Sequence, residues 1–255
     1  MTMELATRAL LVVALAASGA LAQVAAPVRP LVTASTPARP ALRSPQSPVV
    51  SVTDLPLTEV PTTGKGTYLA VFLSGDGGWV TVDKEVSKVL AERGIPVVGV
   101  NSRAYLWNGK TPEQTGADLA RIIAAYRARW QRDSVVIIGY SRGAGIAPFA
   151  VNRLPADVRG RVTTVVLIGA EHGAGFHFHL RDLVRTGLAA DDVLVLPELR
   201  SLGATRVVCF YGADEDDTLC PELAPPAIVV KMKGGHHLDG EYVTIGQRIV
   251  SEIVK

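Results

Sequence analysis

Residues 139–143 read Gly-Tyr-Ser-Arg-Gly and place Ser141 between two glycines in the pattern G-x-S-x-G. The apolar run 135–138 precedes this pattern, and a helical pattern follows it. At a sharp turn from strand to helix, small flanking residues let the backbone approach closely, and the serine hydroxyl stands above the sheet. The helix N-terminus then stabilises negative charge that develops beside it. The pattern predicts that Ser141 is a nucleophile; the alternative is an ordinary glycine-rich turn.

A serine hydroxyl needs a base to activate it and an acid to orient that base. In proteins with this kind of serine turn, the acid and then the histidine follow the serine along the chain. Two segments supply them in that order, each after an apolar run: an acidic loop at 212–221 and Gly-Gly-His-His at 234–237. The Gly-Gly-His turn indicates His236 as the base, with His237 as the alternative.

The acidic loop offers several carboxylates. Asp217 lies four residues before Pro221, a spacing found at the acid of many hydrolases, and we predict that Asp217 is the acid. Asp214 and Glu215 are the alternatives for this role, and we otherwise expect them to contact substrate. The whole loop could instead be a solvated acidic turn.

A second glycine-rich loop, Ser-Gly-Asp-Gly-Gly-Trp at 74–79, follows the apolar run 68–73. Glycines allow a backbone to come close to a substrate oxygen. We therefore predict an oxyanion hole formed by the backbone N–H groups of Asp76 and Arg142, with Trp79 in contact with substrate. The loop lacks the Lys-Ser/Thr ending of a phosphate-binding P-loop, which argues against nucleotide binding.

Other polar and aromatic residues border the same region. Tyr105 follows a predicted strand, and we expect it to line the binding cleft. The irregular stretch 169–200 falls where a lid would lie and contains His172, His177 and His179. Because no set of cysteines or carboxylates completes a ligand sphere around these histidines, we predict no metal and no cofactor.

The elements that must position these residues are short apolar runs alternating with longer amphipathic stretches. We expect strands at 68–73, 97–100, 135–138, 162–168, 206–211 and 228–231, and helices at 82–93, 111–130, 143–153 and 242–254. Continuous apolar strands are typical of sheets covered on both faces, and the alternation predicts a doubly wound, mostly parallel sheet. Sites in such sheets lie at the carboxyl ends of the strands. Together with G-x-S-x-G, this predicts the α/β-hydrolase fold.

The N-terminal part indicates export. The apolar run 9–22 is short for a membrane span and ends in Ala-Leu-Ala, which predicts a cleaved signal peptide at residues 1–22. Residues 23–49 are rich in Pro and Ala and are predicted to be a flexible linker before a hydrolase domain at 50–255. The expected location is periplasmic, and an uncleaved apolar anchor is the alternative.

Charge and cysteines limit the remaining possibilities. With 26 basic and 24 acidic residues the net charge is +2, which gives no field for nucleic acid, and we predict no nucleic-acid partner. Cys209 and Cys220 could pair in an oxidising compartment, although Cys209 falls in a predicted buried strand and could equally be a buried thiol.

The joint set of motifs resembles the VirJ family of bacterial virulence proteins, including the C-terminal domain of its larger relative AcvB. The matching motifs are SGDGGW, KTPEQ, GYSRGAG, DTLCP and GGHHLDG, and they extend from about residue 68 to the C-terminus. The resemblance implies a periplasmic α/β-hydrolase that cleaves aminoacylated phosphatidylglycerol, chiefly lysyl-phosphatidylglycerol. It also implies an association with type IV secretion, for which the sequence shows no feature.

On this resemblance Ser141 would attack the lysyl carbonyl and form a lysyl-enzyme that water hydrolyses. The ammonium groups of lysine would be held by carboxylates of the 214–217 loop, or by Asp76 and Glu171. The partner would be a phospholipid or a small ester, with at most peripheral membrane contact. The alternatives are a general carboxylesterase or thioesterase, and a non-catalytic envelope protein on a hydrolase scaffold.

Overall fold

The computed structural model describes residues 50–179 and 191–254. The predicted signal peptide at 1–22 and linker at 23–49 lie outside these residues. None of the described helices is both long and apolar enough to cross a membrane.

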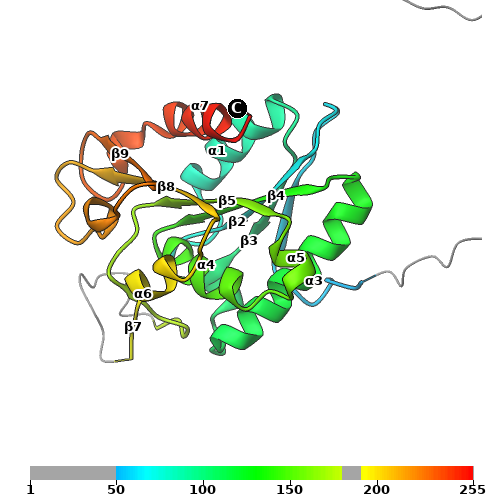
Figure 1. Cartoon of the computed structure of the whole chain (residues 1–255), viewed down its shortest axis with the longest axis horizontal. Coiled ribbons are helices and arrows are strands. Elements are labelled where there is room, and N and C mark those ends of the chain that lie inside the picture. The colour runs from blue at the N-terminus through cyan, green and yellow to red at the C-terminus, as the bar shows by residue number, and fades with distance from the viewer. Residues whose placement is uncertain (1–49, 180–190, 255) are drawn as a thin grey trace, which may run out of the picture. The chain divides into compact units, whose positions relative to one another are not determined.

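A seven-stranded sheet forms the centre of the described chain (Figure 1). Its order is β1-β3-β2-β4-β5-β8-β9, and every neighbouring pair is parallel except β1 with β3. The strands are β1 Leu57–Val60, β2 Tyr68–Leu73, β3 Val97–Val100, β4 Ser134–Tyr140, β5 Val162–Ile168, β8 Arg206–Gly212 and β9 Ile228–Met232. The six predicted strands are therefore confirmed, with ends that differ by at most two residues.

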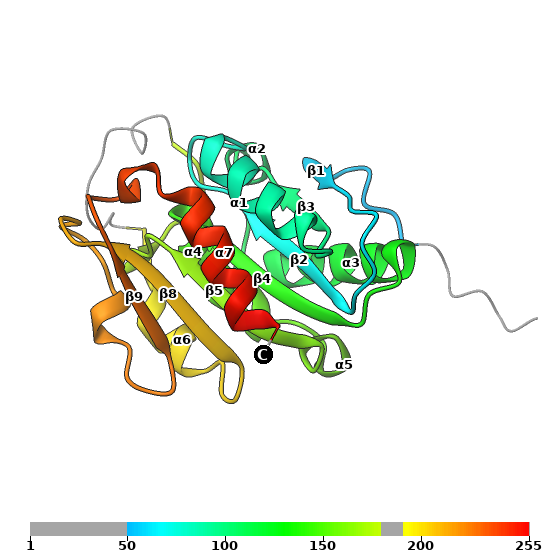
Figure 2. The same cartoon turned by 90° about the horizontal axis from the view of Figure 1, so that it is seen from above.

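Helices cover both faces of the sheet (Figures 1 and 2). On one face α1 packs against α7; on the other α3 packs against α4, with α5 and α6 beside them. The helices are α1 Thr81–Glu92, α2 Ser102–Tyr105, α3 Pro112–Trp130, α4 Arg142–Asn152, α5 Ala156–Arg159, α6 Val195–Arg200 and α7 Tyr242–Ile253. This arrangement confirms the doubly wound architecture.

The core has two layers because successive residues of a strand point to opposite faces. Ile137 in β4 belongs to the apolar cluster under α3 and α4, and Ile138 belongs to the cluster under α1 and α7. Both side chains are fully buried. A strand buried on both faces has to be continuously apolar, which is why the central strands could be recognised in the sequence.

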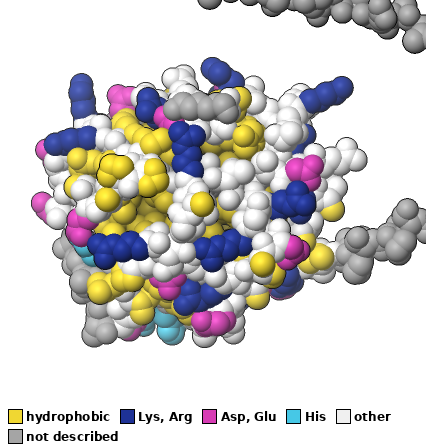
Figure 3. Space-filling view, viewed as in Figure 1, with side chains coloured by type: hydrophobic (Ala, Val, Ile, Leu, Met, Phe, Trp, Pro, Cys, Tyr) yellow, Lys and Arg dark blue, Asp and Glu magenta, His cyan; other side chains and the backbone are white. Residues whose placement is uncertain are grey.

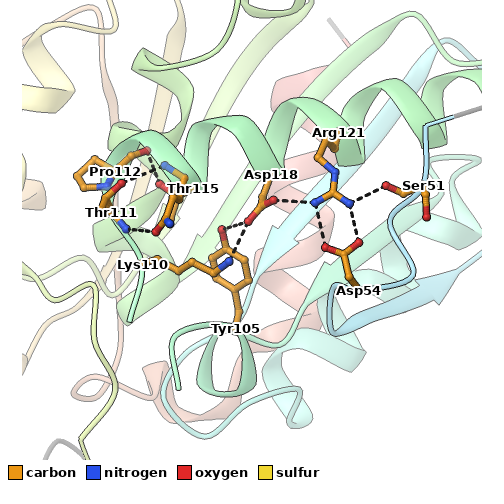
Figure 4. A network of polar contacts seen from close by, with 10 residues as sticks. Ser51, Asp54, Tyr105, Lys110, Thr111, Pro112, Thr115, Asp118 and Arg121 are labelled. Atoms are coloured by element: carbon orange, nitrogen blue, oxygen red, sulfur yellow. Dashed lines mark hydrogen bonds and ion pairs between the residues drawn. The ribbon is translucent and has the colours of Figure 1, made fainter. Parts of the chain in front are cut away.

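Helix α3 begins as its sequence predicts (Figure 4). The backbone N–H of Gln114 donates to the Thr111 hydroxyl at 3.2 Å, and the backbone N–H of Thr111 donates to the Gln114 side chain at 2.9 Å. Pro112 occupies the first helical turn, where the lack of an N–H costs nothing. This reciprocal capping box fixes the start of the helix.

Several short elements have no counterpart in the sequence-based prediction. Strand β1 follows Pro56 and adds an antiparallel edge to the sheet, and β6 Gly173–Ala174 pairs with β7 Val193–Leu194 in a separate two-stranded sheet. Short 3-10 turns lie at Cys220–Glu222 and Leu238–Gly240. Such pieces are too short to show a periodic pattern.

The face in Figure 3 presents hydrophobic side chains on the side that carries α6, β8 and β9. A groove of about 300 Å³ lies between α6 and residues 222–227, and Leu199, Val207 and Leu223 are among its lining residues. Val207 belongs to the amino-terminal part of β8. The groove therefore reaches toward the edge of the sheet opposite to the carboxyl ends of the strands.

Candidate active site

Ser141 occupies a sharp turn between β4 and α4. Its φ of +52° and ψ of −120° lie in a region that non-glycine residues rarely adopt and that costs about 1–3 kcal/mol. The strained turn is held at both ends, since the Ser141 N–H donates to the Ile168 carbonyl at 2.9 Å and its carbonyl accepts from the Gly145 N–H at 3.1 Å. This is the geometry predicted for a serine nucleophile.

Both glycines of the pattern are required by close packing. A Cβ on Gly139 would overlap the Gly143 carbonyl oxygen, and a Cβ on Gly143 would overlap the Leu73 carbonyl oxygen at the end of β2. The first turn of α4 therefore rests directly on strands β4 and β2. Any side chain at these positions would push the helix away and move the serine.

His236 and Glu215 form a hydrogen-bonded pair in which the carboxylate is buried and the imidazole is partly exposed. Nδ1 of His236 lies 2.6 Å from Glu215 Oε1, and the Glu215 side chain is only 3% exposed. The other carboxylate oxygen accepts from the Gly212 N–H at 3.1 Å. A Cβ on Gly212 would overlap the Gly235 carbonyl oxygen, so glycine at 212 lets the acid loop and the histidine loop touch.

The end of β5 connects the serine to this pair. The Ile168 carbonyl holds the Ser141 N–H, and a Cβ on the next residue, Gly169, would lie 3.0 Å from the His236 ring and 3.4 Å from Glu215 Oε1. Ser141, Glu215 and His236 follow β4, β8 and β9 respectively. All three residues thus lie at the carboxyl edge of the sheet.

The choice of Asp217 as the partner of His236 needs correction. Asp217 instead accepts a hydrogen bond from Nδ1 of His172, whose Nε2 lies 2.6 Å from Glu222 Oε1. The backbone explains this, since the Leu219 N–H donates to the Ala170 carbonyl at 3.0 Å and brings this part of the loop beside His172. Glu215, an alternative acid on sequence, is the residue that reaches His236.

Carboxylates shape the protonation of both histidines. Burial disfavours charge on His236, but its hydrogen bond to Glu215 and the charges of Glu215, Glu171 and Asp217 outweigh burial and raise its pKa. The pKa of His172 is also raised, because both of its ring nitrogens face carboxylates.

Glu171 is a half-buried carboxyl beside these groups. Burial raises its pKa, and the negative charges of Asp217, Asp76 and Glu215 act in the same direction, while His236 opposes them. It forms no ion pair within the described part of the chain. Of the carboxylates considered for a cationic substrate, Asp76 and Asp217 already have cationic partners, Arg142 and His172.

His237, which follows His236 in the chain, lies on the side that faces solvent. It is exposed, and its Nδ1 shares a hydrogen bond of 2.8 Å with the Tyr140 hydroxyl. The Tyr140 ring also lies 5.7 Å from the His236 ring. His236, with its buried carboxylate, therefore has the environment of a base, whereas His237 contacts the strand before the nucleophile.

The glycine-rich loop after β2 lies against the nucleophile. A Cβ on Gly75 would be 3.2 Å from the Ser141 Cβ, and the Gly78 N–H donates to the Gly75 carbonyl at 3.1 Å to close a tight turn. Within the described chain the backbone N–H of Asp76, in this turn, has no hydrogen-bond partner. The Arg142 N–H belongs to the first residue of α4. These are the two predicted oxyanion-hole donors.

Cys209 and Cys220 form a disulfide, which resolves the alternative left open by the sequence. Their Cα atoms are 5.6 Å apart, and both residues are fully buried. The bond joins β8 to the short helical turn after the acidic loop. Glu215 lies within the closed loop, so the disulfide limits the movement of the segment that carries the acid.

Trp79 and Tyr105, which we predicted to contact substrate, both make packing contacts in the structure. The Trp79 ring packs edge-on against Phe72, with centroids 5.7 Å apart, and covers Gly99, where a Cβ would overlap it. The Tyr105 ring is buried in the core, and its hydroxyl donates to Asp118 at 2.8 Å (Figure 4). Burial argues against substrate contact for Tyr105, whereas for the partly exposed Trp79 such contact stays a prediction.

Other predicted residues lie at the surface of this region. Asp214 is exposed and has no ion-pair partner among the described residues, so it is open to solvent or substrate. The rings of His177 and His179 lie 4.6 Å apart. No cluster of three or more His, Cys, Asp or Glu side chains suited to a metal occurs within 50–179 and 191–254.

The site contains two roles that sequence reasoning missed. His172 holds Asp217 and Glu222 in place, and Tyr140 contacts the histidine loop. A histidine followed much later by acidic residues gives no signal of pairing. Tyr140 occupies the position before the serine, where the pattern G-x-S-x-G accepts any residue.

A strained serine turn, followed by an acid and a histidine at the carboxyl edge of a doubly wound sheet, defines the α/β-hydrolase fold. The sequence profile of the family described as bacterial virulence protein (VirJ) matches residues 67–255, and the chain belongs to this family. A comparison with curated proteins gives no match.

Solved structures share the fold at low sequence identity. The esterase domain of a Rhodothermus marinus protein is 16% identical, with 76% of this chain and 89% of that chain covered and a TM-score of 0.51. The type II thioesterase BorB of the borrelidin biosynthetic cluster is 16% identical, with 80% and 99% covered and a TM-score of 0.53. Est1E from Butyrivibrio proteoclasticus is 12% identical, with 81% and 98% covered and a TM-score of 0.53.

Proposed function

We propose that the protein is a periplasmic serine hydrolase that cleaves the aminoacyl ester of lysyl-phosphatidylglycerol. The observation that carries the enzymatic part is the pairing of His236 with the buried Glu215 at the edge where Ser141 occupies a strained turn. The substrate is the one that the resemblance to the VirJ family implies. The triad of this proposal is Ser141, His236 and Glu215.

The chemistry follows from the contacts of His236. Because Nδ1 donates to Glu215, Nε2 is the ring nitrogen left to accept a proton. Ser141 Oγ attacks the lysyl carbonyl carbon while His236 takes the hydroxyl proton. The carbonyl electrons move to the oxygen, which the N–H groups of Asp76 and Arg142 stabilise.

Collapse of this intermediate breaks the ester bond. His236 returns its proton to the departing glycerol oxygen, which releases phosphatidylglycerol and leaves lysine esterified to Ser141. Water then attacks the lysyl carbonyl with His236 as base, and the second collapse restores the serine hydroxyl and releases lysine. No cofactor is needed for these steps.

Glu171 is the carboxyl best suited to a substrate ammonium group. Its burial and the neighbouring carboxylates raise its pKa, so a bound cation would supply charge that favours its ionised form. Asp76 and Asp217 are less suited, since Arg142 and His172 already neutralise them. Glu171 would therefore bind the side-chain ammonium group of lysine and select lysyl esters over aminoacyl esters with an uncharged side chain.

The test is release of lysine from purified lysyl-phosphatidylglycerol in mixed micelles, with wild type and Ser141→Ala side by side. Release by wild type alone supports the proposal. Labelling of Ser141 by a fluorophosphonate, without lysine release, would replace it with a general carboxylesterase or thioesterase. Neither labelling nor release would indicate a non-catalytic envelope protein.

The selectivity for an aminoacyl group with a cationic side chain has its own test. In Glu171→Gln we expect kcat/KM for the lysyl lipid to fall about tenfold relative to the alanyl lipid, the loss of one charge-assisted contact. Asp216→Asn, which removes an exposed carboxylate of the acidic loop at 212–221, is the matched control. An unchanged lysyl-to-alanyl ratio in Glu171→Gln would discard this role.

A further inference from the structure

The residues that supply the two oxyanion donors are also joined through their side chains. The Arg142 guanidinium binds the Asp76 carboxylate with two nitrogens: Nε contacts Oδ1, and Nη2 lies 3.1 Å from Oδ2. A planar guanidinium and a carboxylate in this bidentate arrangement fix both distance and orientation. The ion pair therefore connects the turn after β2 to the first residue of α4.

A third contact extends the arrangement. Nη1 of Arg142 donates to the Gly175 carbonyl at 3.0 Å, beside the short strand β6. A Cβ on Gly175 would lie 2.5 Å from this nitrogen, so a side chain there would displace the guanidinium. The guanidinium thus joins three segments around the serine: the turn after β2, the start of α4 and the segment after β5.

The ion pair is shielded from water. The Arg142 side chain is 9% exposed and the Asp76 side chain 22% exposed. By contrast, the bidentate pair of Arg121 with Asp54 is 34% and 58% exposed (Figure 4). Solvent and salt screen a shielded pair less than an open one, so it holds its geometry better.

The turn that carries Asp76 needs such support. It is rich in glycine, and within the described chain the Asp76 N–H is without a hydrogen bond that would hold it. An oxyanion donor stabilises the transition state only when it is fixed in advance at the right position. Arg142 holds the Asp76 carboxylate, whose carbon is only three bonds from that backbone nitrogen.

We propose that the Arg142 side chain is a positioning group of the oxyanion hole, which holds Asp76 so that the backbone N–H groups of both residues converge on one oxygen. This inference rests on the proposed serine-hydrolase function. Asp76 accordingly serves the transition state through its backbone and is not a ligand of the substrate ammonium group.

Inactivation by a fluorophosphonate isolates this role. Ser141 Oγ attacks phosphorus, fluoride leaves, His236 takes the proton, and the phosphoryl oxygen occupies the oxyanion hole. The variants are Asp76→Asn, which keeps shape and backbone N–H, and the double variant Asp76→Asn/Arg142→Gln, which removes the charges of both partners of this ion pair. The control is Asp54→Asn/Arg121→Gln, which removes the exposed bidentate pair of Figure 4.

We expect the maximal inactivation rate to fall 10- to 100-fold in both site variants, the effect of a donor displaced by about 1 Å. The half-saturating probe concentration should stay within threefold, the control should match wild type, and circular dichroism should report folded protein throughout. An unchanged maximal inactivation rate in the folded double variant would overturn this inference and leave the proposed function in place. A change confined to the half-saturating probe concentration would overturn it too, because it would indicate that these side chains bind the probe directly. Absence of Ser141 labelling in wild type would overturn the inference and the proposed function together.

Discussion

The Tyr140 hydroxyl lies 2.8 Å from Nδ1 of His237, and this contact joins the strand that ends at the nucleophile to the loop that carries the base. Tyr140 directly precedes Ser141, and His237 directly follows His236. The Tyr140 side chain is almost fully buried, and its ring lies close to the His236 ring. The hydrogen bond between Tyr140 and His237 thus links the two segments that carry Ser141 and His236, the proposed nucleophile and base.

Tyr140→Phe should therefore slow catalysis without abolishing it. One neutral hydrogen bond contributes about 0.5–1.5 kcal/mol, so kcat should fall roughly 3- to 10-fold while KM changes little. Tyr126→Phe is the matched control, because that hydroxyl donates to Glu59 at 2.8 Å away from the site. Steady-state kinetics of both variants checks the prediction. Equal effects in the two variants would show that Tyr140 contributes only to folding.

Glu215→Gln and Asp217→Asn distinguish the two acids. Glu215→Gln removes the carboxylate that orients His236, and kcat should fall by about 10²–10⁴. Asp217→Asn alters the contact with His172 and removes one of the charges that raise the pKa of His236, but it leaves the Glu215–His236 hydrogen bond intact and should lower kcat less than about fivefold. Lysine release by both variants, with thermal unfolding as the check on folding, provides the comparison. The reverse order of effects would restore Asp217 as the acid.

The fold could be predicted from sequence because its signals are local. Ile137 and Ile138 belong to a continuous apolar run, and Ser141 with its flanking glycines has a fixed spacing. The acid could not be chosen, since Glu215 and Asp217 are two residues apart in one loop. Which of them reaches His236 depends on long-range contacts such as the pairing of Asp217 with His172.

The packing contacts of the aromatic residues could not be predicted from the sequence for a related reason. Trp79 follows a strand end, where both substrate contacts and packing residues occur. Its ring fills the space over Gly99, a glycine on the neighbouring strand β3. The sequence of either segment alone does not show that the two fit together.

The pH dependence of kcat/KM should follow His236. The base must be neutral, and its pKa is raised above the 6.5 of an ordinary imidazole, so activity should fall as pH decreases through a value above 6.5. Glu215→Gln removes a contact that raises this pKa and should move the acid limb to lower pH. Rate profiles between pH 5 and 9 locate the acid limb in wild type and in Glu215→Gln. An acid limb that stays in place in Glu215→Gln would assign it to another group.

Removal of the disulfide should weaken both stability and activity. The bond closes a loop with a sequence separation of 11, for which the loss of chain entropy in the unfolded state predicts about 3 kcal/mol. Cys209→Ala/Cys220→Ala should unfold at lower urea and have a lower kcat, because Glu215 lies inside the loop. Urea titrations with and without reductant measure this difference. Identical unfolding free energies of variant and wild type without reductant would contradict it.

The two glycines Gly143 and Gly160 should respond in opposite ways to alanine. A Cβ on Gly143 would overlap the Leu73 carbonyl, so Gly143→Ala must move α4 and should cost about 3 kcal/mol or more. Gly160, at the end of α5, has φ of −61° and no neighbour closer than 3.4 Å to a new Cβ. Gly160→Ala should be neutral or stabilising by up to about 1 kcal/mol. Urea unfolding of both variants measures the difference, and fluorophosphonate labelling should be lost only in Gly143→Ala. A fully stable, fully labelled Gly143→Ala would mean that the contact between α4 and β2 does not hold Ser141 in place.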